Sequence, residues 1–387
     1  TFKATLGASE AALSGSGHIG EKTTYLFSLR QSHLQLLFKM IGLPFLPNYI
    51  DGQFKVKTRL TPYDELTVMA LAGVDRMELN TDLAGEDEGS DYILSYLPKI
   101  EQETFTVGVS YRHYAGRHVQ TYVLSHNYLN DKNLKYRNND ESTEENLTLR
   151  LRSTEQKTTF RAENMTTLPG GWTLKEGAEL NYMDYTDQLV LTGALNDIGE
   201  ALTENVPDSY RMGIELMLGI KPCKWFQWDI NATWSKNRIK NFVENIPIYD
   251  DDWNLLDVAS VSHKSTRIAF SPDFLLNNRF AFTYQGFEAS LQSQFVGKQY
   301  MTNAEVEALT LDKYFVSNLN LAYTFKPRKV AKEITLGVTV YNLFNEEYEN
   351  NGWASSSYDK DVNHRIDSAG YAAQAGTNVM GHVSFRF

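Results

Sequence analysis

The sequence predicts an all-β fold, a transmembrane antiparallel β-barrel, from three features. Apolar and polar residues alternate strictly in many segments, which is the period of a β-strand with one apolar face. Short turns and long polar connections follow one another alternately along the chain. The chain ends on the apolar face of such a segment, at Phe387. A lipid-facing wall with an aromatic rim explains all three features.

The C-terminal strand, Thr377–Phe387, shows the pattern most clearly. Its polar face carries His382, Ser384 and Arg386. Its apolar face consists of Val379, Gly381, Val383, Phe385 and Phe387. The ending resembles the C-terminal assembly signal of outer-membrane barrels. The edge strand of a soluble β-sandwich is the alternative for this segment taken alone.

Composition narrows the class of protein. The chain has 387 residues, 42% of them hydrophobic, and a mean hydropathy of -0.40. It contains no run of about 18 apolar residues, which excludes a transmembrane helix but not a barrel, because alternation halves the apolar content of each strand. The net charge of -11 argues against nucleic acid as a partner. A single cysteine, Cys223, excludes an internal disulfide framework, and we expect an inert thiol in a tight turn.

The alternation predicts about fifteen strands. They are 1–13, 22–31, 50–61, 64–79, 102–114, 117–130, 145–167, 171–186, 207–220, 224–238, 264–285, 287–299, 313–326, 333–348 and 377–387. Two of them, 145–167 and 264–285, are longer than a membrane requires, and Pro272 predicts an irregularity in the second. The segment Ser32–Ile41 predicts a short helix within a loop.

The connections alternate between two kinds. The tight ones are Thr61–Glu65, Tyr114–Arg117, Leu168–Gly171, Lys221–Lys224 and Gln285–Phe287. The long polar ones are Asp82–Glu101, Asp131–Glu145, Asp187–Asn205, Lys240–His263 and Glu349–Gly376. An odd number of strands cannot close with antiparallel neighbours throughout, and an open edge in lipid leaves backbone groups unpaired. We therefore expect residues 1–387 to be the C-terminal part of a larger barrel.

Candidate catalytic and metal-binding motifs are weak. Ser14–Gly20 contains a formal GxGxxG, but the sequence after it reads as a strand, so we expect a mobile turn and no nucleotide site. The eight histidines are dispersed without metal-ligand spacing. His113 and His118 flank a tight turn, where we expect a rim position. The sequence has no GxSxG motif, and we predict no enzymatic activity and no cofactor.

Two sets of residues are candidates for binding. Asp250, Asp251 and Asp252, followed by Trp253, lie in a long connection, where a solvated loop or a Ca²⁺ site could form, although EF-hand spacing is absent. Side chains opposite the apolar face would give a polar lumen, either lining a solute path or supporting the wall by cross-strand bonds. These residues are Arg150, Arg152, Arg211, Glu215, Asp229 and Asn231.

Several C-terminal stretches resemble TonB-dependent outer-membrane receptors. They are Phe295–Tyr300 (FVGKQY) with Asn303 and Tyr314, Val340–Tyr348 (VYNLFNEEY), the terminal HVSFRF and Ile268–Asp273 (IAFSPD). The resemblance implies a barrel of about 22 strands around an N-terminal plug. It also implies that Val383, Phe385 and Phe387 mark the chain for the barrel-assembly machinery. No plug, no TonB box and about seven strands too few are found here, which agrees with a partial barrel.

The function implied by this resemblance is uptake across the outer membrane of a Gram-negative bacterium. Such a receptor binds a scarce nutrient, for example a siderophore or other metal chelate, cobalamin or a glycan, and imports it with energy from the TonB complex. Contact with TonB would use the missing N-terminal region, and membrane lipid would surround the wall. The alternatives are a passive porin-like channel, a soluble all-β surface protein, and an outer-membrane hydrolase with a Ser–His pair on its inner wall.

Overall fold

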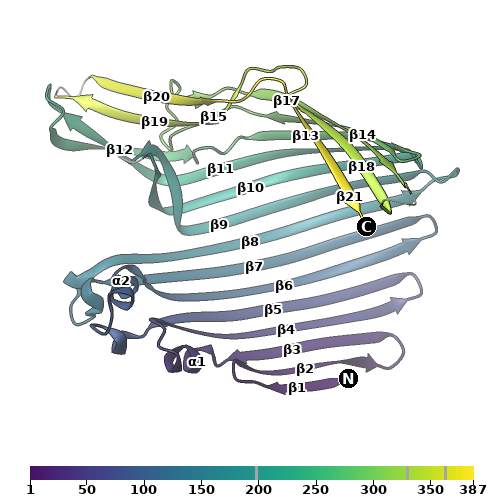
Figure 1. Ribbon diagram of the computed structural model, residues 1–387, viewed down its shortest axis with the longest axis horizontal. Coiled ribbons are helices and arrows are strands. Elements are labelled where there is room, and N and C mark those ends of the chain that lie inside the picture. The colour runs from purple at the N-terminus through teal and green to yellow at the C-terminus, as the bar shows by residue number, and fades with distance from the viewer. Residues whose placement is uncertain (197–198, 328–330, 361–363) are drawn as a thin grey trace. The chain divides into compact units, whose positions relative to one another are not determined.

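The computed structural model describes residues 1–196, 199–327, 331–360 and 364–387. The chain divides into two compact units. Unit 1 comprises residues 1–115, 120–161 and 182–188, and unit 2 comprises 116–119, 162–181 and 189–387. In Figure 1 the strands follow one another as hairpins joined alternately by short turns and long connections. The all-β antiparallel architecture predicted from the sequence is confirmed.

Unit 1 is formed by consecutive antiparallel strands. They are β1 (Phe2–Leu6), β2 (Glu10–Ile19), β3 (Thr23–Ser32), β4 (Phe45–Thr61), β5 (Asp64–Leu79), β6 (Lys99–Ala115) and most of β7 (His118–Tyr136) and β8 (Leu147–Thr167). Pairing is continuous from β1 to β6. Side chains join the next two neighbours, since Asn127 of β7 donates to Thr106 of β6 at 2.7 Å and Thr154 of β8 donates to Asn130 of β7 at 3.3 Å.

Short helices lie only in the long connections of the described chain. They are α1 (Leu34–Met40), η1 (Thr81–Leu83), α2 (Glu88–Tyr96), η2 (Arg137–Asn139) and η3 (Glu144–Asn146). The predicted loop helix is α1, whereas α2 was not predicted. Asp87 caps α2 by accepting the Ser90 N–H at 2.9 Å, and Lys135 donates to the carbonyl of Leu97 beyond its end at 3.1 Å. No helix among the described residues is long and apolar enough to cross a membrane.

Unit 2 holds the rest of β8 and the strands that follow it, except residues 182–188 of β9, which belong to unit 1. Its wall strands are β9 (Thr173–Leu195), β10 (Ala201–Cys223), β11 (Phe226–Tyr249), β12 (Leu255–Arg267), β13 (Phe274–Tyr284), β14 (Phe287–Val296), β17 (Tyr314–Phe325), β18 (Glu333–Tyr341) and β21 (Asn378–Arg386). Two hairpins lie in connections, β15 (Gln299–Tyr300) with β16 (Thr310–Leu311), and β19 (Glu349–Asp359) with β20 (Arg365–Ala373). β11 pairs with β12 at one end and β13 at the other, and the break at 268–273 contains Pro272 as predicted.

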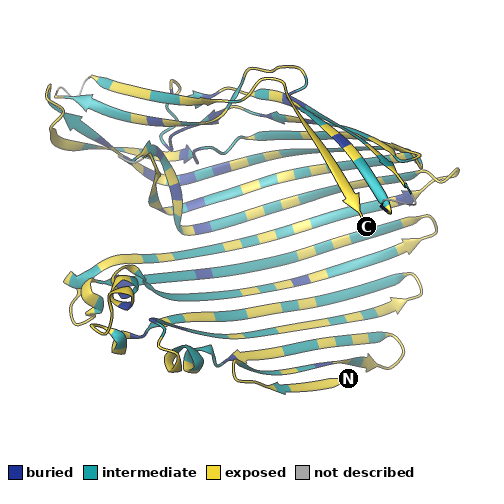
Figure 2. Cartoon of the chain, viewed as in Figure 1, coloured by how far each residue is buried: buried dark blue, intermediate teal, exposed yellow. Residues whose placement is uncertain are grey.

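The last four wall strands have two chemically different faces. Phe287, Tyr323, Leu336 and Val383 stand in one cross-strand row on β14, β17, β18 and β21, and all are exposed. On the opposite face, Thr324 bonds Thr335 at 2.8 Å and Thr339 donates to Asn320 at 2.8 Å. Figure 2 shows exposed and less exposed residues interspersed along most strands, whereas β21 is exposed throughout. An exposed apolar face and a hydrogen-bonded polar face are typical of a membrane wall.

The N-terminal prediction was wrong in two respects. The expected strand 1–13 is two strands, β1 and β2, separated by a turn at residues 7–9. The GxGxxG segment lies largely within β2, where Gly15 and Gly17 face the rings of Phe27 and Tyr25, and a Cβ at Gly15 would lie 2.6 Å from the Phe27 ring. These glycines make room for aromatic neighbours. The sheet of the described residues contains 19 strands, more than the fifteen or so predicted, and the partial barrel stays a prediction.

Three predicted loops are instead strands that continue beyond the expected limits. The connections predicted at 187–205, 240–263 and 349–376 are occupied largely by β9–β10, β11–β12 and β19–β20. Residues 197–198 and 361–363 of these connections lie outside the described part of the chain. In β11 the alternation shifts at Asn241, whose φ is 50°, so that Ile239 and then Phe242 and Ile246 are buried. Because of this shift, a strict period-two pattern does not identify the part of β11 that follows Asn241 as a strand.

Candidate functional site

The long connection after β14, residues 297–313, is folded and anchored, and we call it the 297–313 loop. Met301, Leu309 and Leu311 are buried with Ala354 of β19 in one apolar cluster. The Phe270 N–H donates to the Tyr300 carbonyl at 2.8 Å, which ties the loop to the break between β12 and β13. The backbone carbonyl of Met301 lies so close to Gly193 that a Cβ there would be 2.2 Å from it. The loop therefore has one defined position on unit 2.

Asn303 is the polar centre of this loop and is only 1% exposed. Its side-chain oxygen accepts the Ala269 N–H at 2.9 Å, and its amide donates to the Leu191 carbonyl at 2.8 Å and to Glu204 at 3.2 Å. One side chain thus joins the loop to β9, to β10 and to the segment after β12. Burial raises the pKa of Glu204, an effect that the Asn303 bond opposes and the nearby Glu244 charge reinforces.

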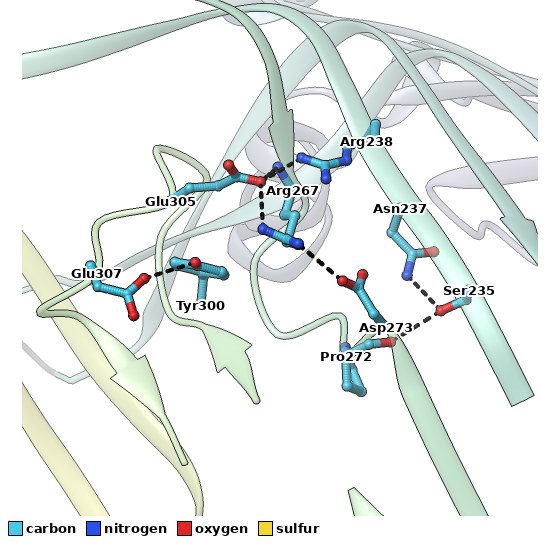
Figure 3. Close-up of polar contacts among 9 residues, drawn as sticks. All are labelled: Ser235, Asn237, Arg238, Arg267, Pro272, Asp273, Tyr300, Glu305 and Glu307. Atoms are coloured by element: carbon cyan, nitrogen blue, oxygen red, sulfur yellow. Dashed lines mark hydrogen bonds and ion pairs between the residues drawn. The ribbon is translucent and has the colours of Figure 1, made fainter. Parts of the chain in front are cut away.

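Figure 3 shows an ionic network that joins the 297–313 loop to β11 and β12. Arg238 of β11 and Arg267 of β12 both bond Glu305 of the loop, at 2.5 and 3.4 Å, and the Arg267 N–H donates to the same oxygen at 2.7 Å. Arg267 also pairs with Asp273 at 3.1 Å. Ser235 donates to the Pro272 carbonyl at 3.0 Å. Because the partners come from separate elements, the network fixes the loop and the break relative to β11.

Tyr300 lies between two cations of this surface. The guanidinium of Arg267 is 5.4 Å and the Lys298 ammonium 5.2 Å from the ring centre, within cation–π range. The Tyr300 hydroxyl donates to Glu307 at 2.9 Å, and Lys298 pairs with the same carboxylate. The bond from Lys298, and then that from Tyr300, lower the pKa of Glu307. The carboxylate therefore remains charged and keeps the edge of the loop in place.

A second ionic cluster joins the β11–β12 hairpin to the β19–β20 hairpin, and we call these two the upper hairpins. Arg365 of β20 binds both carboxylate oxygens of Glu244 on β11, at 2.7 and 3.3 Å, and pairs with Asp367 at 2.8 Å. His263 of β12 lies 3.1 Å from Glu244. Burial opposes the charge on Arg365, but the two carboxylates outweigh it and raise its pKa. These bonds hold β20 against the β11–β12 hairpin.

The predicted lumen residues bond mainly across neighbouring strands. Arg211 donates to Ser271 at 3.1 Å and to Asn237 at 3.4 Å, and Glu215 accepts from Asn231 at 2.9 Å. Asp229 accepts from Gln227 at 2.9 Å and lies 3.8 Å from Arg279. In unit 1, Arg150 pairs with Glu144 at 2.9 Å and Arg152 is exposed. These contacts are those of a wall, and whether the residues also meet a solute stays a prediction.

The predicted acidic loop is a tight turn. Asp250 accepts the N–H groups of Asp252 and Asn254 at 2.9 and 2.8 Å, and Asp251 pairs with Lys360. The Asn254 bonds are the main cause that lowers the pKa of Asp250. Trp253 is 73% exposed and contacts the Tyr249 ring. Among the described residues, no group of three or more acidic, histidine or cysteine side chains could hold a metal ion.

Three histidines of the described strands contact threonine or aspartate side chains. His118 bonds Thr166 at 2.8 Å, His126 bonds Thr158 at 3.0 Å, and His113 lies 2.7 Å from Asp64 at the turn side of β5. In the part of the chain that the structure describes, none of these bonds joins histidine to serine. Cys223 is a free thiol beside a bulge at the β10–β11 turn.

Asn303, Glu204, Glu244 and Arg365 were not predicted as site residues. Asn303 carried a signal, since it follows the FVGKQY segment on which the resemblance rests. The others lie in connections that had been predicted to be loops, where no facing element could be assigned. Their roles depend on contacts between residues up to 121 positions apart.

Strands with an exposed apolar face, a polar opposite face and folded loops at one end define the class of transmembrane β-barrels. Within that class, residues 177–343 match the model of the TonB dependent receptor-like, beta-barrel family. The resemblance drawn from the sequence is confirmed over these residues, which run from β9 to the end of β18 and include the 297–313 loop. A search of curated proteins gives no match.

Solved structures of receptors are also similar to the chain. The FrpB iron transporter of Neisseria meningitidis is 12% identical, with 98% of this chain and 62% of that chain covered and a TM-score of 0.43. The siderophore receptor PirA of Pseudomonas aeruginosa is 10% identical, with coverages of 97% and 58% and a TM-score of 0.47. The ferric enterobactin receptor PfeA of Pseudomonas aeruginosa, in complex with enterobactin, is 12% identical, with 90% and 76% covered and a TM-score of 0.40. Similarity at this level says nothing about the ligand of this chain.

Proposed function

We propose that the protein is an outer-membrane TonB-dependent receptor that binds a scarce nutrient and imports it into the periplasm. The nutrient would be a metal chelate such as a siderophore complex, cobalamin or a glycan, and the TonB complex would supply the energy. The family match over residues 177–343 is the observation that carries this proposal. Transport of this kind depends on binding and conformational gating, without bond chemistry.

The 297–313 loop and the upper hairpins supply the outer binding surface in this proposal. Asn303 and the Arg238–Glu305–Arg267 network hold that surface in one arrangement, which lowers the entropic cost of binding a ligand. Contact with TonB would lie in a region preceding Thr1. The barrel-assembly machinery would recognise Val383, Phe385 and Phe387, which are all exposed on one face of the C-terminal strand.

Uptake measurements in the bacterium that encodes the protein test this function. Labelled ferric siderophores, cobalamin and oligosaccharides would be offered to cells with the gene intact, with the gene deleted, and with TonB disrupted. We expect the uptake of one nutrient to be lost both without the gene and without TonB. Gene-dependent uptake that persists without TonB would contradict the proposal and favour the passive channel.

A further inference from the structure

One face of the β19–β20 hairpin carries no charged residue, and we call it the neutral face. The register places Trp353 opposite Gly370 and Ser355 opposite Ser368, so these residues share one side of the hairpin. Every side chain on this side is uncharged, from Asn351 to Ser357 on β19 and from Ile366 to Ala372 on β20. The charged residues Arg365 and Asp367 belong to the opposite side.

The opposite side of the hairpin is packed, which holds the neutral face in place. Ala354 is buried against Met301, Leu309 and Leu311 of the 297–313 loop. Arg365 bonds Glu244 of β11 at 2.7 Å, as described above. The end of β19 also pairs with the end of β11, within unit 2. The neutral face is therefore a fixed surface at the end of unit 2 that carries the long connections.

Trp353 is the aromatic side chain of the neutral face, and it is 40% exposed. Its indole lies over Gly370, where an added Cβ would overlap with the ring nitrogen. The absence of a side chain at Gly370 thus lets the ring rest on the neighbouring strand. The exposed part of the indole offers a small apolar surface in the middle of polar residues.

Hydroxyl groups lie beside this indole. Ser355 and Ser368 form the next cross-strand pair on the neutral face, roughly 7 Å along the strands from Trp353. Within the described chain, neither hydroxyl makes a hydrogen bond, and a serine hydroxyl can both donate and accept. A sugar ring has the matching chemistry, because its C–H groups pack on an aromatic ring while its hydroxyls need polar partners. A charged ligand would find no counter-charge on this face.

We propose that the neutral face binds an uncharged oligosaccharide, with one sugar ring packed on Trp353 and its hydroxyls bonded by Ser355 and Ser368. The inference rests on the proposed function, and it selects a glycan among the nutrients that such a receptor could import. Gly370 acts as a positioning residue, since it keeps the indole against β20.

Calorimetric titration of the purified full chain in detergent tests this site without a transport assay. The probes are short linear oligosaccharides of glucose, mannose, galactose or xylose. We expect at least one of them to bind the wild type, and Trp353→Ala to weaken that binding about tenfold or more. The matched control is Trp253→Ala, because Trp253 is 73% exposed but lies in the acidic turn. Binding of none of these sugars, or equal binding by the wild type and Trp353→Ala, would overturn the proposal.

Two further titrations address misfolding and the source of the sugar. Trp353→Phe keeps a ring on the hairpin and should restore most of the binding that Trp353→Ala loses. Lipid-free core oligosaccharide of lipopolysaccharide represents the sugars of the membrane itself, and binding of that probe alone would contradict a nutrient site. TonB-dependent uptake of a metal chelate without sugar binding would overturn only this inference. Sugar binding with uptake that is independent of TonB would overturn only the proposed function.

Discussion

Asn303 shows how one buried polar side chain can organise a loop. Its three hydrogen bonds join it to three separate segments. The partners are the Ala269 N–H, the Leu191 carbonyl and the Glu204 carboxylate. Met301 and Leu309, on either side of it in the loop, are buried, but apolar contacts are non-directional and do not fix the orientation of the loop. The position of the 297–313 loop is therefore set by hydrogen bonding at Asn303.

Replacing Asn303 with alanine should loosen the loop. The N–H of buried Ala269 would lose this partner, which costs roughly 1–3 kcal/mol of unfolding free energy. Urea unfolding of the refolded chain in lipid vesicles, followed by tryptophan fluorescence, measures the change. Thr310→Ala in the same loop is the control, since its hydroxyl makes only an exposed contact of 3.4 Å. An unchanged midpoint for Asn303→Ala would contradict this role.

Glu204 gives a pH dependence of the opposite sign to that of an ordinary paired carboxylate. Its pKa is raised in the folded protein, mainly by burial, so the folded state binds a proton more tightly than the unfolded state. Stability from this group should rise as the pH falls through the folded pKa. Glu204→Gln keeps an acceptor for Asn303 and removes the charge.

The expected result for Glu204→Gln is a variant slightly more stable than the wild type at pH 7, with a difference that disappears on acidification. Melting temperatures between pH 7 and pH 4 measure this, and Asp312→Asn at an exposed position of the 297–313 loop serves as the control. A loss of stability that is the same at all pH values would show that Glu204 acts only through its hydrogen bond.

At the scale of elements, wall strands and short turns followed from the sequence, whereas the upper hairpins did not. Where one face meets an apolar environment, period-two alternation is kept, as in the paired segments Ser209–Ile220 of β10 and Phe226–Trp234 of β11. Above the wall both faces meet either water or other loops, and a single left-handed residue such as Asn241 shifts the alternation. The contact of Glu244 with Arg365 joins residues 121 positions apart, so a local sequence pattern cannot predict it.

The turn between β13 and β14 is a second element that sequence and structure explain together. Gln285 and Gly286 have φ values of 49° and 85°, as a two-residue hairpin turn requires. A Cβ at Gly286 would lie 2.4 Å from the Thr324 carbonyl of the adjacent strand.

Gly286→Ala should therefore destabilise the hairpin by more than the roughly 1 kcal/mol expected from backbone strain alone. The matched control is Gly116→Ala in another short turn, where φ is 62° but no atom lies within 4 Å of the added Cβ. Refolding yield in vesicles should fall in the order wild type, Gly116→Ala, Gly286→Ala. Equal yields for the two variants would mean that the approach to Thr324 has no effect.

At the scale of the whole molecule, the sequence predicted the class and the family match, whereas its candidate site residues stay predictions. The class follows from alternation and from the apolar ending at Phe387, both of which are local. The candidate lumen residues were chosen by strand face alone, and residues such as Arg211 and Glu215 bond to wall neighbours. The ligand-facing surface depends on how the 297–313 loop and the upper hairpins pack, which requires contacts between distant residues.

The measurement that tests the account most directly is the accessibility of successive residues along β18 in a bilayer. Single spin labels at positions 334–340, in a chain with Cys223→Ser, would report collisions with oxygen, which concentrates in lipid, and with a water-soluble nickel complex. We predict oxygen maxima at Leu336 and Val338, and nickel maxima at Thr335 and Thr339, with a period of two residues. Nickel accessibility without that period, high on both faces, would contradict a membrane wall and favour a soluble sheet.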